Sequence, residues 1–212
     1  MSSATSADTG YRHLFWDMGG TIVNTYPELD AALAQVVRGH GNTIDDHDVA
    51  LLTRRSTGEA ISTLAARFRI SEPEFREAEA ALKARWRTAP PQAMPGLRET
   101  MAAVSGLNLV VTHRDRDSAA SLLESLGIVV DDLVCTSDGH PRKPDPAMHL
   151  ALLRRHRLEP QQCLSIGDRP IDATAAHAAG MDAAMLRTPG IEFDNDAEHQ
   201  VECLTELLPL LH

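Results

Sequence analysis

Four short segments carry most of the side chains that could do chemistry: residues 15–21, 111–113, 142–144 and 166–172. In chain order they are written FWDMGGT, VTH, RKP and IGDRPID. They offer a carboxylate after an apolar run, a hydroxyl, a lysine and a further pair of carboxylates. Such a set could hold a divalent cation and a phosphoryl group beside an aspartate that acts as a nucleophile.

Asp17 is the candidate nucleophile, because it ends an apolar run over residues 11–17 and is soon followed by Gly19 and Gly20. A carboxylate can accept a phosphoryl group and release it to water, which divides one difficult step into two. The glycines permit a tight turn in which the backbone approaches a phosphate closely. Taken alone, Asp17 could instead cap a turn, as Asp beside Gly often does. The other three segments favour the catalytic interpretation.

Asp168 and Asp172 stand four residues apart, at the end of an expected strand and in the first turn of the next expected helix. Carboxylates placed in this way suit Mg²⁺, a hard cation that prefers oxygen ligands and would offset the repulsion between acids and phosphate. Both residues could also stabilise the helix, Asp168 as its cap and Asp172 near its positive end. The two interpretations are compatible.

Lys143 is unusual because the chain contains only two lysines, the other being Lys83, against eighteen arginines. A sequence so rich in Arg keeps Lys mainly where a compact, rotatable ammonium differs in function from a planar guanidinium. Lys143 is therefore a candidate for binding a phosphoryl group, with a solvated lysine in a Pro-rich turn as the alternative. Arg142 beside it could help to attract an anion and is counted with the substrate-binding candidates.

The elements expected around these residues alternate between apolar strand and helix, which predicts an α/β protein with a doubly wound, mostly parallel, Rossmann-like sheet. In such sheets ligands bind beyond the carboxyl ends of the strands, where Asp17, Thr112 and Asp168 are expected. The expected strands cover residues 11–17, 107–112, 133–135, 163–166 and 183–186, and the expected helices cover 97–104, 116–127, 146–157, 171–180 and 201–211.

Residues 25–92 follow a helical period without a convincing strand, so we expect an all-helical cap inserted into the α/β core. The core then comprises residues 11–24 and 93–212. Residues 1–10 are rich in Ser, Thr and Ala and lack an apolar segment, which predicts a disordered tail rather than a signal peptide.

With these motifs in this order, the chain resembles the haloacid dehalogenase-like (HAD) hydrolase superfamily, and within it the phosphoglycolate-phosphatase-like subgroup with a helical cap. The resemblance implies an Mg²⁺-dependent phosphatase that hydrolyses a small phosphorylated metabolite through an aspartyl-phosphate at Asp17. It also implies that Asp168 binds the metal directly and that Asp172 supports it. Thr112 and Lys143 would bind the transferring phosphoryl group.

The same resemblance gives expectations for the remaining candidates. Gly20 and Thr21 are counted with the substrate-binding residues. So are Arg54 and Arg55, which lie in a polar stretch of the expected cap, residues 54–59. In the family a polar cap loop of this kind approaches the active site. His113 occupies a position where family members frequently have Asn; it is counted with the catalytic residues, and a structural hydrogen bond is the alternative.

Gly19 is the main departure from the family pattern, since the usual DxDGT is written here as DMGGT. In the family the second aspartate gives its backbone carbonyl to the metal and its carboxyl to acid–base catalysis. Gly19 keeps the carbonyl, and is counted with the metal ligands, but it has no carboxyl. Proton transfer of this kind is typically worth roughly 10²–10⁴-fold in rate, so substrates with good leaving groups should be affected least.

The composition excludes several other classes of protein. A formal net charge of −10 leaves no basic surface for nucleic acid. No apolar run approaches the roughly 20 residues of a membrane span. Cys135, Cys163 and Cys203 lack the spacing of a zinc site or of a disulfide framework. We therefore expect a cytoplasmic monomer or homodimer whose partner is a small metabolite.

Three other functions remain open on the sequence alone. A 2-haloacid dehalogenase would share the aspartate nucleophile but would not need the metal. A phosphonate hydrolase would need a lysine in the cap to form a Schiff base, and Lys83 is the sole candidate. A homologue that binds a phosphometabolite without hydrolysing it is kept open by Gly19.

Overall fold

The computed structural model describes residues 10–212, so the tail expected over residues 1–10 lies, apart from Gly10, outside the described residues. Contacts within the chain divide it into two compact units. Of the described residues, the first unit contains 10–18, 95–116 and 130–212, and the second contains 19–94 and 117–129. The expected helical insert, residues 25–92, falls within the second unit.

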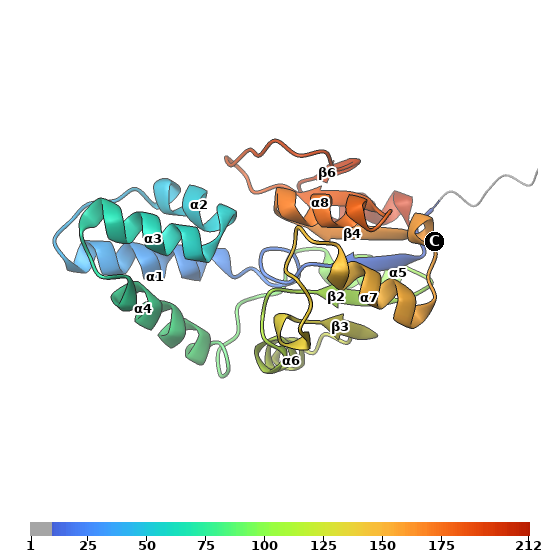
Figure 1. Cartoon of the computed structure of the whole chain (residues 1–212), viewed down its shortest axis with the longest axis horizontal. Coiled ribbons are helices and arrows are strands. Elements are labelled where there is room, and N and C mark those ends of the chain that lie inside the picture. The colour runs from blue at the N-terminus through green and yellow to red at the C-terminus, as the bar shows by residue number, and fades with distance from the viewer. Residues whose placement is uncertain (1–9) are drawn as a thin grey trace, which may run out of the picture. The chain divides into compact units, whose positions relative to one another are not determined.

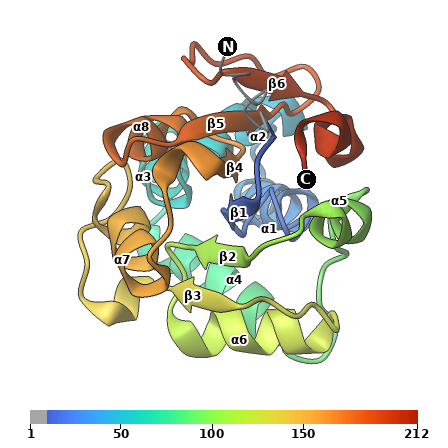
Figure 2. The same ribbon diagram turned by 90° about the vertical axis from the view of Figure 1, so that its right-hand side faces the viewer.

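The first unit is built on a six-stranded parallel sheet with the order β3-β2-β1-β4-β5-β6 (Figures 1 and 2). The chain begins in the middle of the sheet, moves to one edge through β2 and β3, and then returns to β4 to build the other half. This is the doubly wound α/β fold expected from the sequence, which is confirmed. The strands are β1 His13–Trp16, β2 Asn108–Val111, β3 Asp132–Val134, β4 Cys163–Gly167, β5 Asp182–Leu186 and β6 His199–Val201.

The central strands are mostly apolar, as expected where helices cover both faces of the sheet. Leu14, Phe15 and Trp16 of β1 are fully buried, and every residue of β4 is buried. Helices α7 and α8 lie on one face, and α5 with the 3₁₀ helix η3 lies on the other (Figure 2). These elements are α5 Leu97–Ala103, α7 Ala147–His156, α8 Pro170–Ala178 and η3 Leu204–Leu210, with the short 3₁₀ turns η1 Thr136–Asp138 and η2 Pro160–Gln162.

The carboxyl ends of the strands meet at one edge of the sheet. Trp16, the last residue of β1, is in register with Ile166 near the end of β4. Asp17 and Asp168, which follow these two strands, therefore leave the sheet close to one another, and Thr112 follows the neighbouring strand β2. This is the edge at which sheets of this topology bind ligands.

The second unit is helical. Helix α1 packs against α2 and α4, and α2 packs against α3. Leu33, Ile61, Leu64 and Phe75 are fully buried in this unit. Among the described residues, no helix combines the length and the apolar character needed to cross a bilayer. The helices are α1 Tyr26–Gly39, α2 Asp46–Arg55, α3 Thr57–Phe68, α4 Glu72–Arg85 and α6 Arg116–Ser125. Helix α6 begins one residue before segment 117–129 of this unit.

The end of the chain differs from the helix predicted over residues 201–211, and that prediction is wrong. Val201 ends β6, where it lies in register with Leu186 of β5. The residues after it form the 3₁₀ helix η3, in which Leu204 and Leu207 are buried at a spacing of three. Pro209 has no N–H to donate, which disfavours an α-helix here.

Helix α2 is not predicted by the hydrophobic period, because only Val49, Thr53 and Arg54 are buried among its residues. It begins instead with a local cap, in which the Asp45 side chain accepts a hydrogen bond from the backbone N–H of His47 (2.8 Å). The polar stretch that begins with Arg54 therefore ends α2 and leads into α3.

Candidate active site

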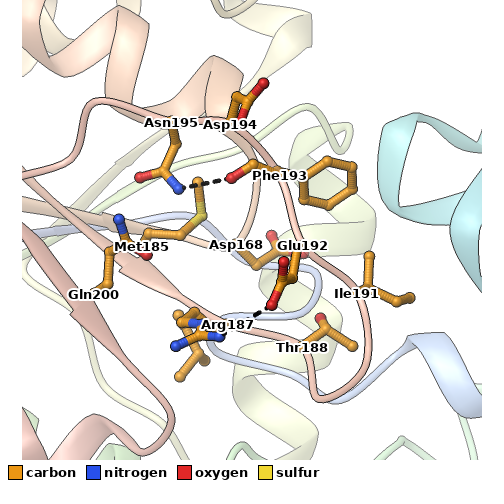
Figure 3. Close-up of a pocket in the computed structure, with 11 residues that line it drawn as sticks. Asp168, Met185, Arg187, Thr188, Ile191, Glu192, Phe193, Asp194, Asn195 and Gln200 are labelled. Atoms are coloured by element: carbon orange, nitrogen blue, oxygen red, sulfur yellow. Dashed lines mark hydrogen bonds and ion pairs between the residues drawn. The ribbon is translucent and has the colours of Figure 1, made fainter.

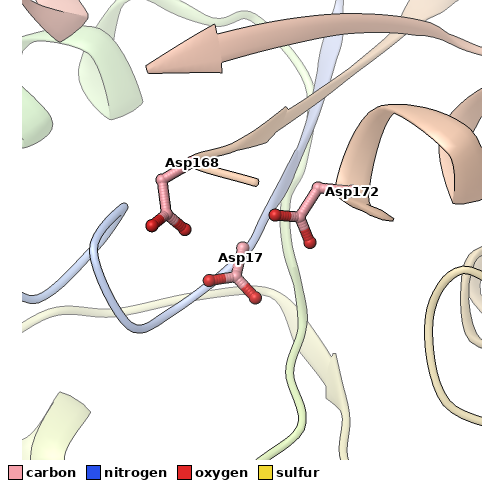
Figure 4. Close-up of side chains that lie close together, drawn as sticks. All are labelled: Asp17, Asp168 and Asp172. Carbon is pink, nitrogen blue, oxygen red and sulfur yellow. The ribbon is translucent and has the colours of Figure 1, made fainter. Parts of the chain in front are cut away.

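Three carboxylates converge at the carboxyl edge of the sheet. Asp17 follows β1, Asp168 follows β4, and Asp172 lies in the first turn of α8. One oxygen of each lies within 4.8 Å of the others, and the three side chains point toward one another (Figure 4). Their residues are only 5%, 3% and 3% exposed. The structure thus brings together the three carboxylates that the sequence singled out.

The local backbone explains this convergence. The N–H of Asp17 donates to the carbonyl of Ile166 (2.8 Å), which fixes the end of β1 against β4. Gly167 is required because a Cβ atom there would lie 2.3 Å from the Cβ of Asp172. The Asp172 carboxylate also accepts a hydrogen bond from the N–H of Arg169 (3.1 Å), at the start of α8. The first turn of α8 can therefore pack directly against the strand end.

Lys143 lies between two of the carboxylates. Its Nζ atom is 2.5 Å from Oδ1 of Asp17 and 2.6 Å from Oδ1 of Asp172, and it donates to the carbonyl of Val111 (3.1 Å). Burial raises the pKa of the Asp17 carboxyl, and the Lys143 ammonium opposes that shift. Burial alone would lower the pKa of Lys143, but the two carboxylates together raise it above its ordinary value. Lys143 is therefore a buried, charged ammonium.

The charges of this cluster fit a divalent cation. Three buried carboxylates face one buried ammonium, and oxygen ligands of this kind are those that Mg²⁺ prefers. An excess of buried negative charge is costly unless a cation balances it. The residues present therefore suit an additional hard cation.

Thr112 and His113 lie on the same edge but make different contacts. Oγ1 of Thr112 accepts a hydrogen bond from the N–H of Arg114 (3.2 Å), which leaves its own hydroxyl hydrogen to donate. Nε2 of His113 accepts the backbone N–H of Lys143 (2.9 Å). Burial, with the positive charges of Lys143, Arg142 and Arg169, lowers the pKa of His113 to about 3. His113 is thus a neutral ring that holds the backbone of Lys143.

Gly19, Gly20 and Thr21 open the second unit. Gly20 has a φ of 88°, whereas Gly19 does not have a positive φ. A Cβ atom at Gly19 would meet only Oγ1 of Thr25, at 3.3 Å. Oγ1 of Thr21 is buried and has no hydrogen-bond partner within residues 10–212. The tight turn therefore depends on Gly20, and a Cβ atom at Gly19 would require the Thr25 side chain to shift by a few tenths of an ångström.

The three arginines among the candidates are in different environments. Arg54 is buried, and its Nη1 lies 2.5 Å from Oδ2 of Asp30 while its guanidinium stacks 3.8 Å from the centre of the Tyr26 ring. Arg55 is exposed and lies 3.3 Å from Glu59. Arg142 is exposed beside Lys143. Arg54 is thus engaged within its own unit, while the other two guanidinium groups face solvent.

Sequence analysis missed two basic residues near the site. Arg169 is close enough for its charge to affect the pKa values of Asp17, Asp172 and His113. Its position between two aspartates of the IGDRPID segment is the signal that could have identified it. His149 is buried with Nε2 3.1 Å from Oγ of Ser165, near enough for the charges of Lys143 and Asp172 to affect its pKa, which burial lowers to about 3. Nothing in the local sequence distinguishes it from a surface histidine of α7.

Residues 11–180 match the family model of the haloacid dehalogenase-like hydrolases. The chain belongs to this family. The match covers the segments with Asp17, Lys143 and Asp168, so the family expected from these motifs is confirmed, as is the expected enzyme class of phosphatase-type hydrolase.

Related proteins and structures extend this result. The chain is 28% identical to validoxylamine A 7′-phosphate phosphatase of Streptomyces hygroscopicus subsp. limoneus, over 95% of this chain and 93% of that protein. It is 29% identical to phosphoglycolate phosphatase of Rhodospirillum rubrum, over 82% and 78%. A HAD family hydrolase from Deinococcus radiodurans R1, solved with bound phosphate and sodium, has a TM-score of 0.79 at 20% identity and covers 96% of this chain and 99% of its own. That likeness shows the fold alone.

Proposed function

We propose that this protein is an Mg²⁺-dependent phosphatase that hydrolyses a small phosphorylated metabolite through an aspartyl-phosphate at Asp17. The observation that carries the proposal is the buried contact of Asp17 with Lys143 (2.5 Å), beside the further carboxylates Asp168 and Asp172. A nucleophilic carboxylate, a cation for the phosphoryl oxygens and ligands for a metal thereby share one edge of the sheet.

In the proposed reaction Asp17 attacks the phosphorus atom, and the bond from phosphorus to the leaving oxygen breaks. Water then attacks the phosphorus of the aspartyl-phosphate, so that inorganic phosphate leaves and the Asp17 carboxylate is restored. The Lys143 ammonium stabilises the charge on the phosphoryl oxygens in both steps. Thr112 donates its hydroxyl hydrogen to one of these oxygens, since its Oγ1 already accepts from the backbone.

Asp17, Asp168 and the backbone carbonyl of Gly19 would bind Mg²⁺, with Asp172 in support. A bound Mg²⁺ supplies neutralisation of the phosphoryl charge. Asp172 also holds Lys143 in place, since its Oδ1 lies 2.6 Å from Nζ.

His113 acts in this proposal by positioning Lys143. Its Nε2 is occupied by the Lys143 N–H, and a pKa of about 3 leaves it unable to donate a proton near neutral pH. Gly19 has no side-chain carboxyl that could donate the proton instead of His113. The leaving oxygen must then take its proton from solvent, so leaving groups of low basicity should react fastest.

The substrate class follows from the relatives, which are named for phosphoglycolate and for validoxylamine A 7′-phosphate. Both names indicate a small organic phosphate, and we propose the same class here. That Arg55 and Arg142 contribute to binding the organic phosphate stays a prediction. The cellular location and the oligomeric state expected from the sequence also stay predictions.

A metabolite panel tests this function directly. Phosphate release from a set of sugar, polyol and carboxylic acid phosphates should depend on added Mg²⁺ and be abolished by a chelator. The chelator also separates the phosphatase from a 2-haloacid dehalogenase, whose reaction would survive it. Absence of hydrolysis of any phosphate ester, including p-nitrophenyl phosphate, would contradict the proposal.

The missing carboxyl at Gly19 favours one second candidate, a homologue that binds a phosphometabolite without turning it over. Calorimetry distinguishes the two. A metabolite that binds in the presence of Mg²⁺ and is recovered intact after prolonged incubation would support the binding protein, whereas release of phosphate supports the enzyme.

A further inference from the structure

A cavity of about 380 Å³ lies in the first unit, between the carboxyl end of the sheet and the loop that joins β5 to β6 (Figure 3). Its volume is within the range of small-molecule sites. Asp168, a member of the buried carboxylate cluster, forms part of its wall. Through Asp168 the cavity therefore adjoins the carboxylate cluster beside which the phosphoryl group is proposed to bind.

The loop that forms the outer wall, residues 187–198, is fixed by its own hydrogen bonds. The Asn195 amide donates to the carbonyl of Phe193 (3.1 Å) and accepts the N–H of Ala197 (3.2 Å). Near the end of the loop, the Glu198 carboxylate accepts the N–H of Ala183 in β5 (2.8 Å). A wall held in this way is organised before a ligand arrives, which lowers the entropy cost of binding.

The loop side of the cavity is acidic. Glu192 and Asp194 line it, and residues 188–212 contain no Lys or Arg. Arg187, the basic residue of the lining, lies 3.9 Å from Glu192 and 3.8 Å from Glu202. These two carboxylates partly neutralise its positive charge. An anion that entered the cavity would meet a surplus of negative charge.

Other lining groups suit a hydroxylated carbon skeleton. Ile191 and Phe193 offer apolar surface, while Thr188 and Gln200 offer a hydroxyl and an amide. We propose that this cavity receives the organic leaving group of the substrate and selects neutral or positively charged hydroxylated groups over groups that carry a carboxylate or a second phosphate. The inference rests on the proposed phosphatase function, because it assumes that the phosphoryl group is held by Lys143.

The expected selectivity is moderate because the acids are accessible to solvent. The Glu192 side chain is 88% exposed, so dissolved salt will screen its charge. We expect a cationic leaving group to be preferred over an anionic one by about tenfold at low ionic strength. The same preference should shrink as salt is added.

Three substrates that share a phosphate on carbon 6 test this selectivity. Glucosamine 6-phosphate carries a cation, glucose 6-phosphate is neutral apart from its phosphate, and 6-phosphogluconate carries a carboxylate. The wild-type kcat/KM should fall in that order, and the spread should narrow in high salt. Equal values, or a preference for 6-phosphogluconate, would overturn the inference.

A double variant, Glu192→Gln with Asp194→Asn, should reduce the ratio of glucosamine 6-phosphate to 6-phosphogluconate by about tenfold. The matched control is Glu99→Gln on α5, an exposed acid outside the cavity, which should leave that ratio unchanged. An unchanged ratio in a folded double variant contradicts the inference. If thermal melting shows that the double variant is unfolded, the salt dependence of the wild-type ratio decides instead.

Binding separates this inference from the proposed function. Calorimetry on Asp17→Asn with Mg²⁺ should give the same order of affinities for the three sugar phosphates without any chemical step. If the protein hydrolyses p-nitrophenyl phosphate but binds the three sugar phosphates with equal affinity, the role assigned to the cavity is wrong and the phosphatase function stands. If no phosphate ester is hydrolysed but the order of affinities holds, the cavity assignment stands and the phosphatase function fails.

Discussion

Each unit of this protein contains a buried contact between an aspartate and a basic side chain, and the two contacts differ in how their charges balance. In the second unit Asp30 lies against Arg54, and the hydroxyl of Thr53 donates to the same aspartate (2.6 Å). One carboxylate meets one guanidinium. In the first unit Lys143 lies between two carboxylates, and Asp168 adds a third.

This difference separates a structural ion pair from a candidate ligand site. The opposite charges of Asp30 and Arg54 neutralise each other. The face of the guanidinium is covered by the Tyr26 ring. Even with the nearby charge of Arg169, the three carboxylates around Lys143 keep an excess of negative charge in a buried place. A further cation would relieve that excess, and this is the physical reason to assign metal and phosphoryl chemistry to the first unit.

The largest effect should come from removing the cation of the unbalanced cluster. Lys143→Met leaves Asp17 and Asp172 without their ammonium, and it removes the group that stabilises the phosphoryl oxygens. We expect kcat to fall by about 10²–10³-fold. Steady-state kinetics with p-nitrophenyl phosphate measure this, since that leaving group needs no acid. A kcat within about twofold of the wild type would show that Lys143 acts only in structure.

The corresponding change in the balanced pair should act on stability. Arg54→Met leaves Asp30 buried without its partner, and the free energy of unfolding should fall by about 3–5 kcal/mol. Urea denaturation measures the loss. Adding Asp30→Asn to the variant should recover part of it, because the uncompensated charge is then removed. A stability unchanged by Arg54→Met would mean that the pair is not a structural element, and would return Arg54 to the substrate-binding candidates.

Gly19→Asp sharpens the comparison by introducing a carboxyl two residues after Asp17 in the sequence. The backbone permits it, since Gly19 has no positive φ, and the one close contact of a Cβ there, with Oγ1 of Thr25 at 3.3 Å, is relieved by a small shift of that side chain. We expect kcat on alkyl phosphates to rise by roughly 10–100-fold and kcat on p-nitrophenyl phosphate to change little, because leaving-group protonation matters in proportion to basicity.

The control for Gly19→Asp is a melting curve that matches the wild type. If alkyl-phosphate turnover stays flat in the folded variant, while His113→Ala abolishes turnover of alkyl phosphates and spares p-nitrophenyl phosphate, His113 supplies the proton after all. Its position as an acceptor for Lys143 would then not describe the working enzyme.

Much of the first unit is predictable from sequence because its signals are local. A mostly apolar run followed by an aspartate marks the end of β1 just before Asp17, and the same pattern marks the end of β4 just before Asp168. Strand ends of one parallel sheet lie at one edge, so the meeting of these residues follows from the topology. The site roles assigned to them stay predictions.

The features that sequence did not predict depend on contacts between distant residues. Val201 reads as the start of a helix until its pairing with Leu186 in β5 is known. Arg54 reads as an exposed substrate-binding residue until Asp30, 24 positions earlier, is found against it. The cavity beside Asp168 depends on the path of the loop over residues 187–198, which no local pattern indicates.

The most direct test asks whether phosphate becomes attached to Asp17. The protein should be mixed with Mg²⁺ and an excess of a substrate that it hydrolyses, quenched in acid within one turnover, digested, and analysed by mass spectrometry. We predict a phosphorylated peptide that contains Asp17 and that is absent from Asp17→Asn, which should also lack turnover. Full hydrolytic activity in Asp17→Asn, or a phosphoryl group on another residue, would contradict the central claim.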